Sequence, residues 1–127
     1  MNNMRKSLCV LTAVAAVLAF AGQSAAFCVH NYTDRDMAFS QSSGEVLGKG
    51  YRNTLSPGET GCCNWGNKDC NKKGHKDSAV GFTVSHGTYP TGRDVCINKK
   101  IPACSDLDVT GSKGIYQCVP HGMETCN

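Results

Sequence analysis

The chain has 127 residues, of which 13 are Lys or Arg and 10 are Asp or Glu, and its formal net charge is +3. This length suits one domain rather than two. The apolar run at residues 8–21 is too short for a membrane-spanning helix, and nothing later in the chain approaches the roughly 18 apolar residues that identify one. The small net charge gives no support for nucleic-acid binding, and the nine cysteines argue against a cytosolic enzyme.

The first 26 residues have the pattern of a secretory signal peptide. Arg5 and Lys6 form a positively charged N-terminal region, and residues 8–21 form an apolar run. The small residues at 24–26 suit a cleavage site before Phe27. We therefore expect a mature domain of residues 27–127 that is secreted, or periplasmic if the source is Gram-negative. The mature chain has 11 basic and 10 acidic residues, so its net charge falls to about +1.

Alternating apolar and polar residues predict short β-strands in the mature chain and little helix. In chain order, the expected strands are residues 27–33, 37–41, 51–55, 60–65, 79–86, 95–97, 107–110 and 115–119. The clearest is the one at residues 79–86, in which Val80, Phe82, Val84 and His86 share a face that we expect to meet the core and its rim. The regular spacing predicts an all-β fold, a small disulfide-stabilised β-sandwich or barrel with long polar loops.

Two turns and one modification signal lie between these strands. Residues 56–59 read Ser-Pro-Gly-Glu, with Pro and Gly in the positions that a β-turn favours, and a strand can return after them. Residues 111–114 read Gly-Ser-Lys-Gly and predict a hairpin turn. Asn31, Tyr32 and Thr33 match an N-glycosylation sequon, which has meaning only in a eukaryotic secretory pathway.

The low apolar content makes the cysteines the expected main source of stability. Leu, Ile, Val and Phe together make up only 16 of the 101 mature residues, and eight cysteines remain after removal of the signal peptide. Four disulfides at about 2–4 kcal/mol each would be comparable to the whole net stability of a domain. We expect all eight mature cysteines to be paired: Cys28, Cys62, Cys63, Cys70, Cys96, Cys104, Cys118 and Cys126.

The order of the cysteines favours some pairings over others. Cys62 and Cys63 are adjacent and point to opposite faces of a strand, so they need different partners, and one of them is expected to bond Cys70. Cys104 and Cys118 bracket the expected hairpin and are expected to pair. The alternative is a zinc site made of Cys62, Cys63, Cys70 and His75. Its spacing is poor, and secretion favours disulfides, so we expect neither a metal nor a cofactor.

The most polar stretch, residues 67–77, follows the only tryptophan of the chain. Its lysines outnumber Asp69 and Asp77, and a cationic loop beside an aromatic residue suits an acidic polysaccharide, a phosphate or an anionic membrane surface. The alternative interpretation is a solvated hairpin tip with the tryptophan packed beneath it. The candidate binding residues are Trp65, Lys68, Lys72, Lys73, His75 and Lys76.

No sequence motif of a hydrolase, metalloprotease or phosphate-binding loop occurs. We therefore expect a secreted, monomeric and non-catalytic binding protein of the effector, toxin, inhibitor or surface-recognition type. Its partner would be an extracellular macromolecule, an anionic surface or glycan rather than a nucleic acid. The alternative is a small secreted hydrolase such as a ribonuclease, in which Glu59 acts with His86 or His75 and an arginine.

Overall fold

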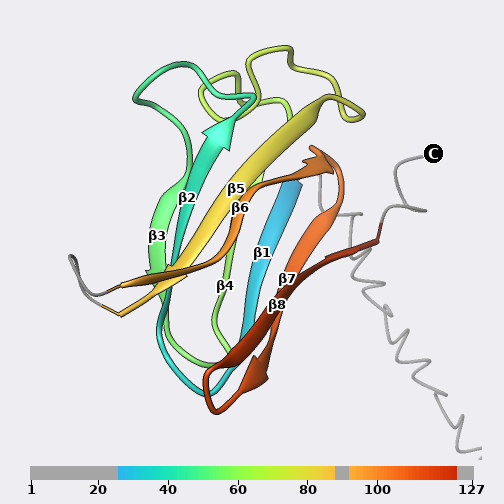
Figure 1. The fold of residues 1–127 in the computed structure, drawn as a ribbon. Coiled ribbons are helices and arrows are strands. Elements are labelled where there is room, and N and C mark those ends of the chain that lie inside the picture. The colour runs from blue at the N-terminus through green and yellow to red at the C-terminus, as the bar shows by residue number, and fades with distance from the viewer. Residues whose placement is uncertain (1–25, 88–91, 123–127) are drawn as a thin grey trace, which may run out of the picture.

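The computed structural model describes residues 26–87 and 92–122, which form two four-stranded sheets (Figure 1). The first sheet has the order β4-β1-β7-β8 and consists of β4 (Thr60–Asn64), β1 (Ala26–Thr33), β7 (Asp106–Ser112) and β8 (Ile115–His121). The second has the order β3-β2-β5-β6 and consists of β3 (Arg52–Leu55), β2 (Met37–Ser43), β5 (Ala79–His86) and β6 (Arg93–Pro102). The described residues contain no helix, and the predicted all-β fold is confirmed as a sandwich-like pair of sheets.

Two parts of the sequence prediction lie outside the described residues. Residues 1–25 of the expected signal peptide lie outside the described residues, whereas Ala26 is the first residue of β1. Cys126 also lies outside the described residues. In the part of the chain that the structure describes, no helix is long and apolar enough to cross a membrane.

The core is built from the alternating inward side chains of both sheets, as sheet-on-sheet packing requires. β5 has the predicted bounds and lies between β2 and β6, and its residues Val80, Phe82 and Val84 are fully buried. Phe82 meets Phe27 of the facing sheet edge to face, with ring centroids 5.0 Å apart. The other buried apolar residues that join these in the core are Val29, Met37, Phe39, Leu55, Cys70, Ile101, Ala103, Leu107 and Val109.

The strand that differs most from the prediction is β6, which extends well beyond the expected residues 95–97. It is an edge strand that pairs only with β5, and most of its side chains are exposed or half-buried. The pairing shifts register between Phe82 and Val84 and again between Val84 and Ser85, and Asn98 has a φ of 46°. Such irregularities break the alternation of apolar and polar residues along a strand. Only the apolar residues 95–97 in its middle were therefore predicted to form a strand.

Two of the four connections that cross between the sheets lie where the sequence suggested hairpins. β3 and β4 belong to different sheets, as do β4 and β5, so residues 65–78 are a crossover and not a hairpin tip. The expected turn at residues 56–59 is present: Glu59 N donates to Ser56 O (3.0 Å), and Gly58 has a φ of 84°. A positive φ at this third position, after Pro57, matches a type II turn.

Three disulfides join described residues. Cys28–Cys62 links neighbouring positions of β1 and β4, and Cys63–Cys70 links β4 to the following loop. The adjacent cysteines thus have different partners, and the expected bond to Cys70 is confirmed for Cys63. The third, Cys96–Cys118, ties β6 of one sheet to β8 of the other.

The predicted bond between Cys104 and Cys118 is wrong, and the hairpin register explains why. β8 places Cys118 opposite Val109. Cys104 precedes Val109 by five residues, about 17 Å along an extended strand, whereas a disulfide needs Cα atoms within about 7 Å. Cys104 is itself disulfide-bonded, which agrees with the expectation that it is crosslinked but not with the expected partner.

Candidate functional site

Two loops come together at one end of the sandwich, the upper end in Figure 1. They are residues 44–50, between β2 and β3, and residues 66–77, between β4 and β5. Val46 N donates to Asp69 O (3.0 Å), Lys72 N donates to Gly44 O (2.7 Å), and the Lys49 ammonium lies 3.9 Å from the Asp69 carboxylate. We call the joint surface of residues 44–50 and 66–77 the cationic end.

The backbone of residues 66–77 is held from below by buried groups. The Asn71 side chain is fully buried, and its amide donates to Trp65 O (2.7 Å) and His75 O (2.8 Å). The buried Gln41 amide donates to Cys70 O (2.5 Å), and the disulfide to Cys63 fixes the same residue. Residues 66–77, which the sequence predicts to be an exposed loop, therefore contain two buried residues that anchor it, Cys70 and Asn71.

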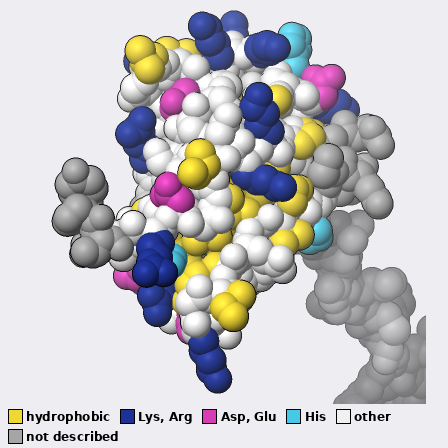
Figure 2. Space-filling view, in the orientation of Figure 1, with side chains coloured by type: hydrophobic (Ala, Val, Ile, Leu, Met, Phe, Trp, Pro, Cys, Tyr) yellow, Lys and Arg dark blue, Asp and Glu magenta, His cyan; other side chains and the backbone are white. Residues whose placement is uncertain are grey.

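The side chains that point outward from this backbone are cationic. All five candidate binding residues of the loop, four lysines and one histidine, are exposed: Lys68, Lys72, Lys73, His75 and Lys76. With Lys49, the cationic end carries five lysines against the carboxylates of Glu45, Asp69 and Asp77. Figure 2 shows Lys and Arg side chains gathered at the top of the molecule, over these loops.

Trp65 differs from the other candidate binding residues in its surroundings. It is half-buried and packs against the hydrophobic core, while its carbonyl accepts a hydrogen bond from Asn71. This packing against the core favours the alternative interpretation, in which the tryptophan is a packed residue and not part of a binding surface. The cationic end also contains Leu47, which the sequence did not indicate as a candidate binding residue and whose exposed fraction is 93%.

The cysteines of the alternative zinc site are occupied by disulfides. Cys62 is bonded to Cys28, and Cys63 is bonded to Cys70, so none of the three offers a thiolate to a metal. Within residues 26–87 and 92–122, no group of three or more His, Cys, Asp or Glu side chains is arranged to hold a metal ion.

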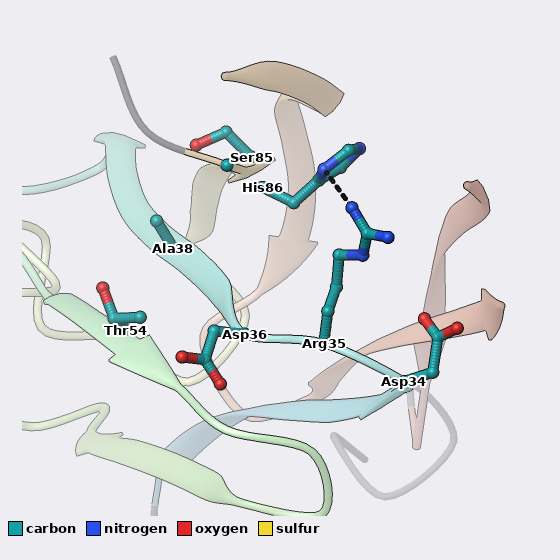
Figure 3. A pocket seen from close by; sticks show the side chains of 8 residues that line it. Asp34, Arg35, Asp36, Ala38, Thr54, Ser85 and His86 are labelled. Atoms are coloured by element: carbon teal, nitrogen blue, oxygen red, sulfur yellow. Dashed lines mark hydrogen bonds between the residues drawn. The ribbon is translucent and has the colours of Figure 1, made fainter. Parts of the chain in front are cut away.

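A second candidate site is a shallow cavity of about 530 Å³ on the outer side of the β3-β2-β5 sheet (Figure 3). Its floor is made of small side chains that are cross-strand neighbours, Thr54, Ala38 and Ser85. Its walls come from the turn between β1 and β2 and from the end of β5: Asp34, Arg35, Asp36, His86 and Gly87. The sequence did not indicate this cavity because its residues come from separate segments.

The charged groups of the cavity are largely engaged with one another or with the β7–β8 hairpin. Arg35 donates to Nδ1 of His86 (3.4 Å), and its guanidinium lies over the ring of Tyr116, 5.6 Å from the centroid. Asp34 points away from the cavity in Figure 3. Its carboxylate accepts hydrogen bonds from Lys113 N (3.0 Å) and the Tyr116 hydroxyl (2.6 Å), which hold the pKa of Asp34 below its ordinary value.

The groups of the alternative hydrolase site make separate contacts. Glu59 accepts a hydrogen bond from Ser56 N (2.8 Å) within its own turn. His75 lies on the cationic end, and His86 lies in the cavity beside Arg35. Among the described residues, no hydrogen bond or ion pair joins Glu59 to either histidine.

A polar network on the outward face of the other sheet was also not expected. His30 contacts the Thr60 hydroxyl through Nδ1 (2.8 Å) and the Asp106 carboxylate through Nε2 (3.0 Å), and it stacks on Tyr32. A hydroxyl, an imidazole and a carboxylate in this order also occur in catalytic sites, where they are the nucleophile, its base and the group that orients the base. Thr60, however, is the direct cross-strand partner of His30, so the network joins β4, β1 and β7 as a sheet-stabilising contact.

Searches of protein-family models, of curated proteins and of solved structures find no match to this chain. Functional inference therefore depends on the geometry described above.

Proposed function

We propose that this protein is a secreted, non-catalytic binding protein whose cationic end attaches to an extracellular polyanion. The observation that carries the proposal is that exposed lysines stand on a loop whose backbone is fixed from inside by Asn71, Gln41 and the Cys63–Cys70 disulfide. The lysines are therefore presented on an ordered backbone.

Pre-organisation matters for a charge-led contact because exposed ion pairs are individually weak. Each contributes only about 0.2–1 kcal/mol, partly because the side chains and backbone must be ordered. A loop that is already ordered loses less conformational entropy on binding. Several lysines on one fixed backbone can therefore bind an anionic polymer that a single lysine would not hold.

The crosslinks support the secreted part of the proposal. Three disulfides join described residues, and Cys104 is bonded as well. Disulfides persist in oxidising compartments such as the extracellular space or the periplasm. The hydrolase alternative has less support, because among the described residues no hydrogen bond or ion pair joins Glu59 to His75 or His86.

The experiment that tests the proposal compares two triple variants of the oxidised protein on immobilised heparin and polygalacturonate. The first is Lys72→Gln, Lys73→Gln and Lys76→Gln on the cationic end. The second is Arg52→Gln, Arg93→Gln and Lys113→Gln, which removes the same charge from exposed positions elsewhere.

We expect the lysine variant to bind about tenfold more weakly, since three exposed charges at roughly 0.5 kcal/mol each amount to about 1.5 kcal/mol. The matched variant should bind nearly as the parent does, and binding should weaken with added salt. Equal losses in both variants, or parental binding by the lysine variant, would contradict a localised polyanion site. Tighter binding to RNA than to either polysaccharide would contradict the expected class of partner.

A further inference from the structure

Leu47 is the most exposed large apolar side chain in the described part of the molecule. It occupies the second position of a closed turn, in which Lys49 N donates to Val46 O (2.9 Å) and Gly48 has a φ of 78°. These features match a type II β-turn, whose second and third residues form the projecting corner. The leucine is thus held outward by an ordered backbone.

The position of this leucine differs from that of the other exposed apolar residues. Its turn is bonded to the lysine loop through Val46 N and Asp69 O, and Lys49 follows two residues later. Ile115, with an exposed fraction of 82%, lies instead in the β7–β8 hairpin at the opposite end of the sandwich (Figure 1). An apolar tip and a group of lysines therefore share one end of this molecule.

This combination fits one class of polyanion better than the others. A bilayer interface accepts an aliphatic side chain among its acyl chains and offers lipid phosphates to surrounding lysines. A soluble anionic polysaccharide offers charge but no apolar phase for the leucine. We infer that the cationic end docks on an anionic lipid bilayer, with Leu47 inserted into the interface and the lysines against the phosphates. This inference rests on the proposed function, because it names the kind of polyanion that the cationic end would bind.

The test is flotation of the oxidised protein with two kinds of vesicle, one of phosphatidylcholine alone and one that also contains phosphatidylglycerol. We expect binding to the anionic vesicles and little binding to the neutral ones. Leu47→Ser should weaken vesicle binding about tenfold, because the apolar transfer of the side chain is lost. Ile115→Ser makes a similar apolar-to-polar change at the opposite end and should have no effect.

Heparin binding by the same proteins separates this inference from the proposed function. Leu47→Ser removes no charge, so it should weaken heparin binding far less than vesicle binding. If lysine-dependent heparin binding is present but anionic vesicles are not bound, or Leu47→Ser binds them as the parent does, the lipid inference is wrong and the proposed function stands. Equal binding to neutral vesicles also overturns the lipid inference. If neither heparin nor anionic vesicles are bound, both proposals fail.

Discussion

At the scale of single residues, the loops of this protein are ordered by three buried amide side chains. Asn31, Gln41 and Asn71 are essentially inaccessible, and each donates to backbone carbonyls of connecting segments. Burial of an amide is costly unless it is hydrogen-bonded. These side chains therefore fix the loops and also depend on them. The buried state of Asn31 means that the sequon does not present its acceptor in the folded protein.

The first prediction concerns Asn71. Its replacement by Ala leaves the carbonyls of Trp65 and His75 without their donor, so we expect a loss of about 1–3 kcal/mol in the free energy of unfolding. Lys73→Ala, in the same loop but exposed, should change it by less than about 0.5 kcal/mol. Urea denaturation measures both. A loss for Asn71→Ala no larger than that of the lysine control would show that the amide is not an anchor.

The second prediction concerns the acid side of the stability profile. The backbone amide of Lys113 and then the Tyr116 hydroxyl lower the pKa of Asp34 below 3.8, its ordinary value. A carboxyl with a lowered folded-state pKa stabilises the fold above its unfolded pKa, and this contribution is lost as the pH falls through the folded pKa. Between about pH 5 and pH 2 the parent should thus lose more thermal stability than Asp34→Asn. Parallel melting curves for the two proteins across this range would contradict the assignment.

At the scale of elements, the third prediction tests the packing of β5. Phe82 is fully buried between the sheets and lies edge to face against Phe27 and Tyr51. Phe82→Ala should lower the free energy of unfolding by about 3–5 kcal/mol. Ile97→Ala, on the exposed edge of β6, should have little effect. Chemical denaturation of both variants measures the difference, and a loss below about 1 kcal/mol for Phe82→Ala would mean that this face does not form the core.

The fourth prediction links the Cys63–Cys70 disulfide to binding. Replacement of both cysteines by Ser should lower stability by about 2–3 kcal/mol, the loop-closure value for a short loop. It should also weaken polyanion binding several-fold, although every lysine remains, because the loop must then be ordered on binding. The paired control, Cys28→Ser with Cys62→Ser, removes a disulfide outside the loop. If heparin affinity falls equally in both double variants, the loop disulfide has no specific role in binding.

The elements could be predicted from the sequence where one local rule decides them. All eight strands follow from alternation, and β5 has the predicted bounds because both its ends and its apolar face are regular. β6 was underestimated because the register shifts along its pairing with β5 disturb the alternation. The Cys96–Cys118 bond joins two sheets whose facing edges no local pattern reveals.

The positive charge of the candidate site could be predicted from the sequence, but the buried contacts that hold its loop could not. The lysines of residues 66–77 are visible in the sequence, whereas the packing of Trp65 and the buried state of Asn71 depend on contacts with distant strands. The sequence did not indicate Leu47, because a leucine in a glycine-rich segment resembles any loop residue. The cavity beside Arg35 depends on the register of β2, β3 and β5.

At the scale of the whole molecule, charge is distributed unevenly although its sum is small. The cationic end has five lysines and three carboxylates, whereas the rest of residues 27–127 has six basic and seven acidic residues. The positive excess therefore belongs to one end of the sandwich. At ionic strengths near 0.1 M, charges farther apart than about 10 Å are screened from one another. The proposed polyanion binding depends on this local excess and not on the net charge.

The most direct test of a polyanion site on the cationic end is a map of chemical-shift changes in the ¹⁵N-labelled, oxidised protein during titration with a short heparin oligosaccharide. The largest changes should fall in residues 44–50 and 66–77, and they should reverse as salt is added. The amides around Arg35 and His86, in the cavity on the outer face of the second sheet, should change little. Changes centred on that cavity, or scattered evenly over the surface, would contradict the account.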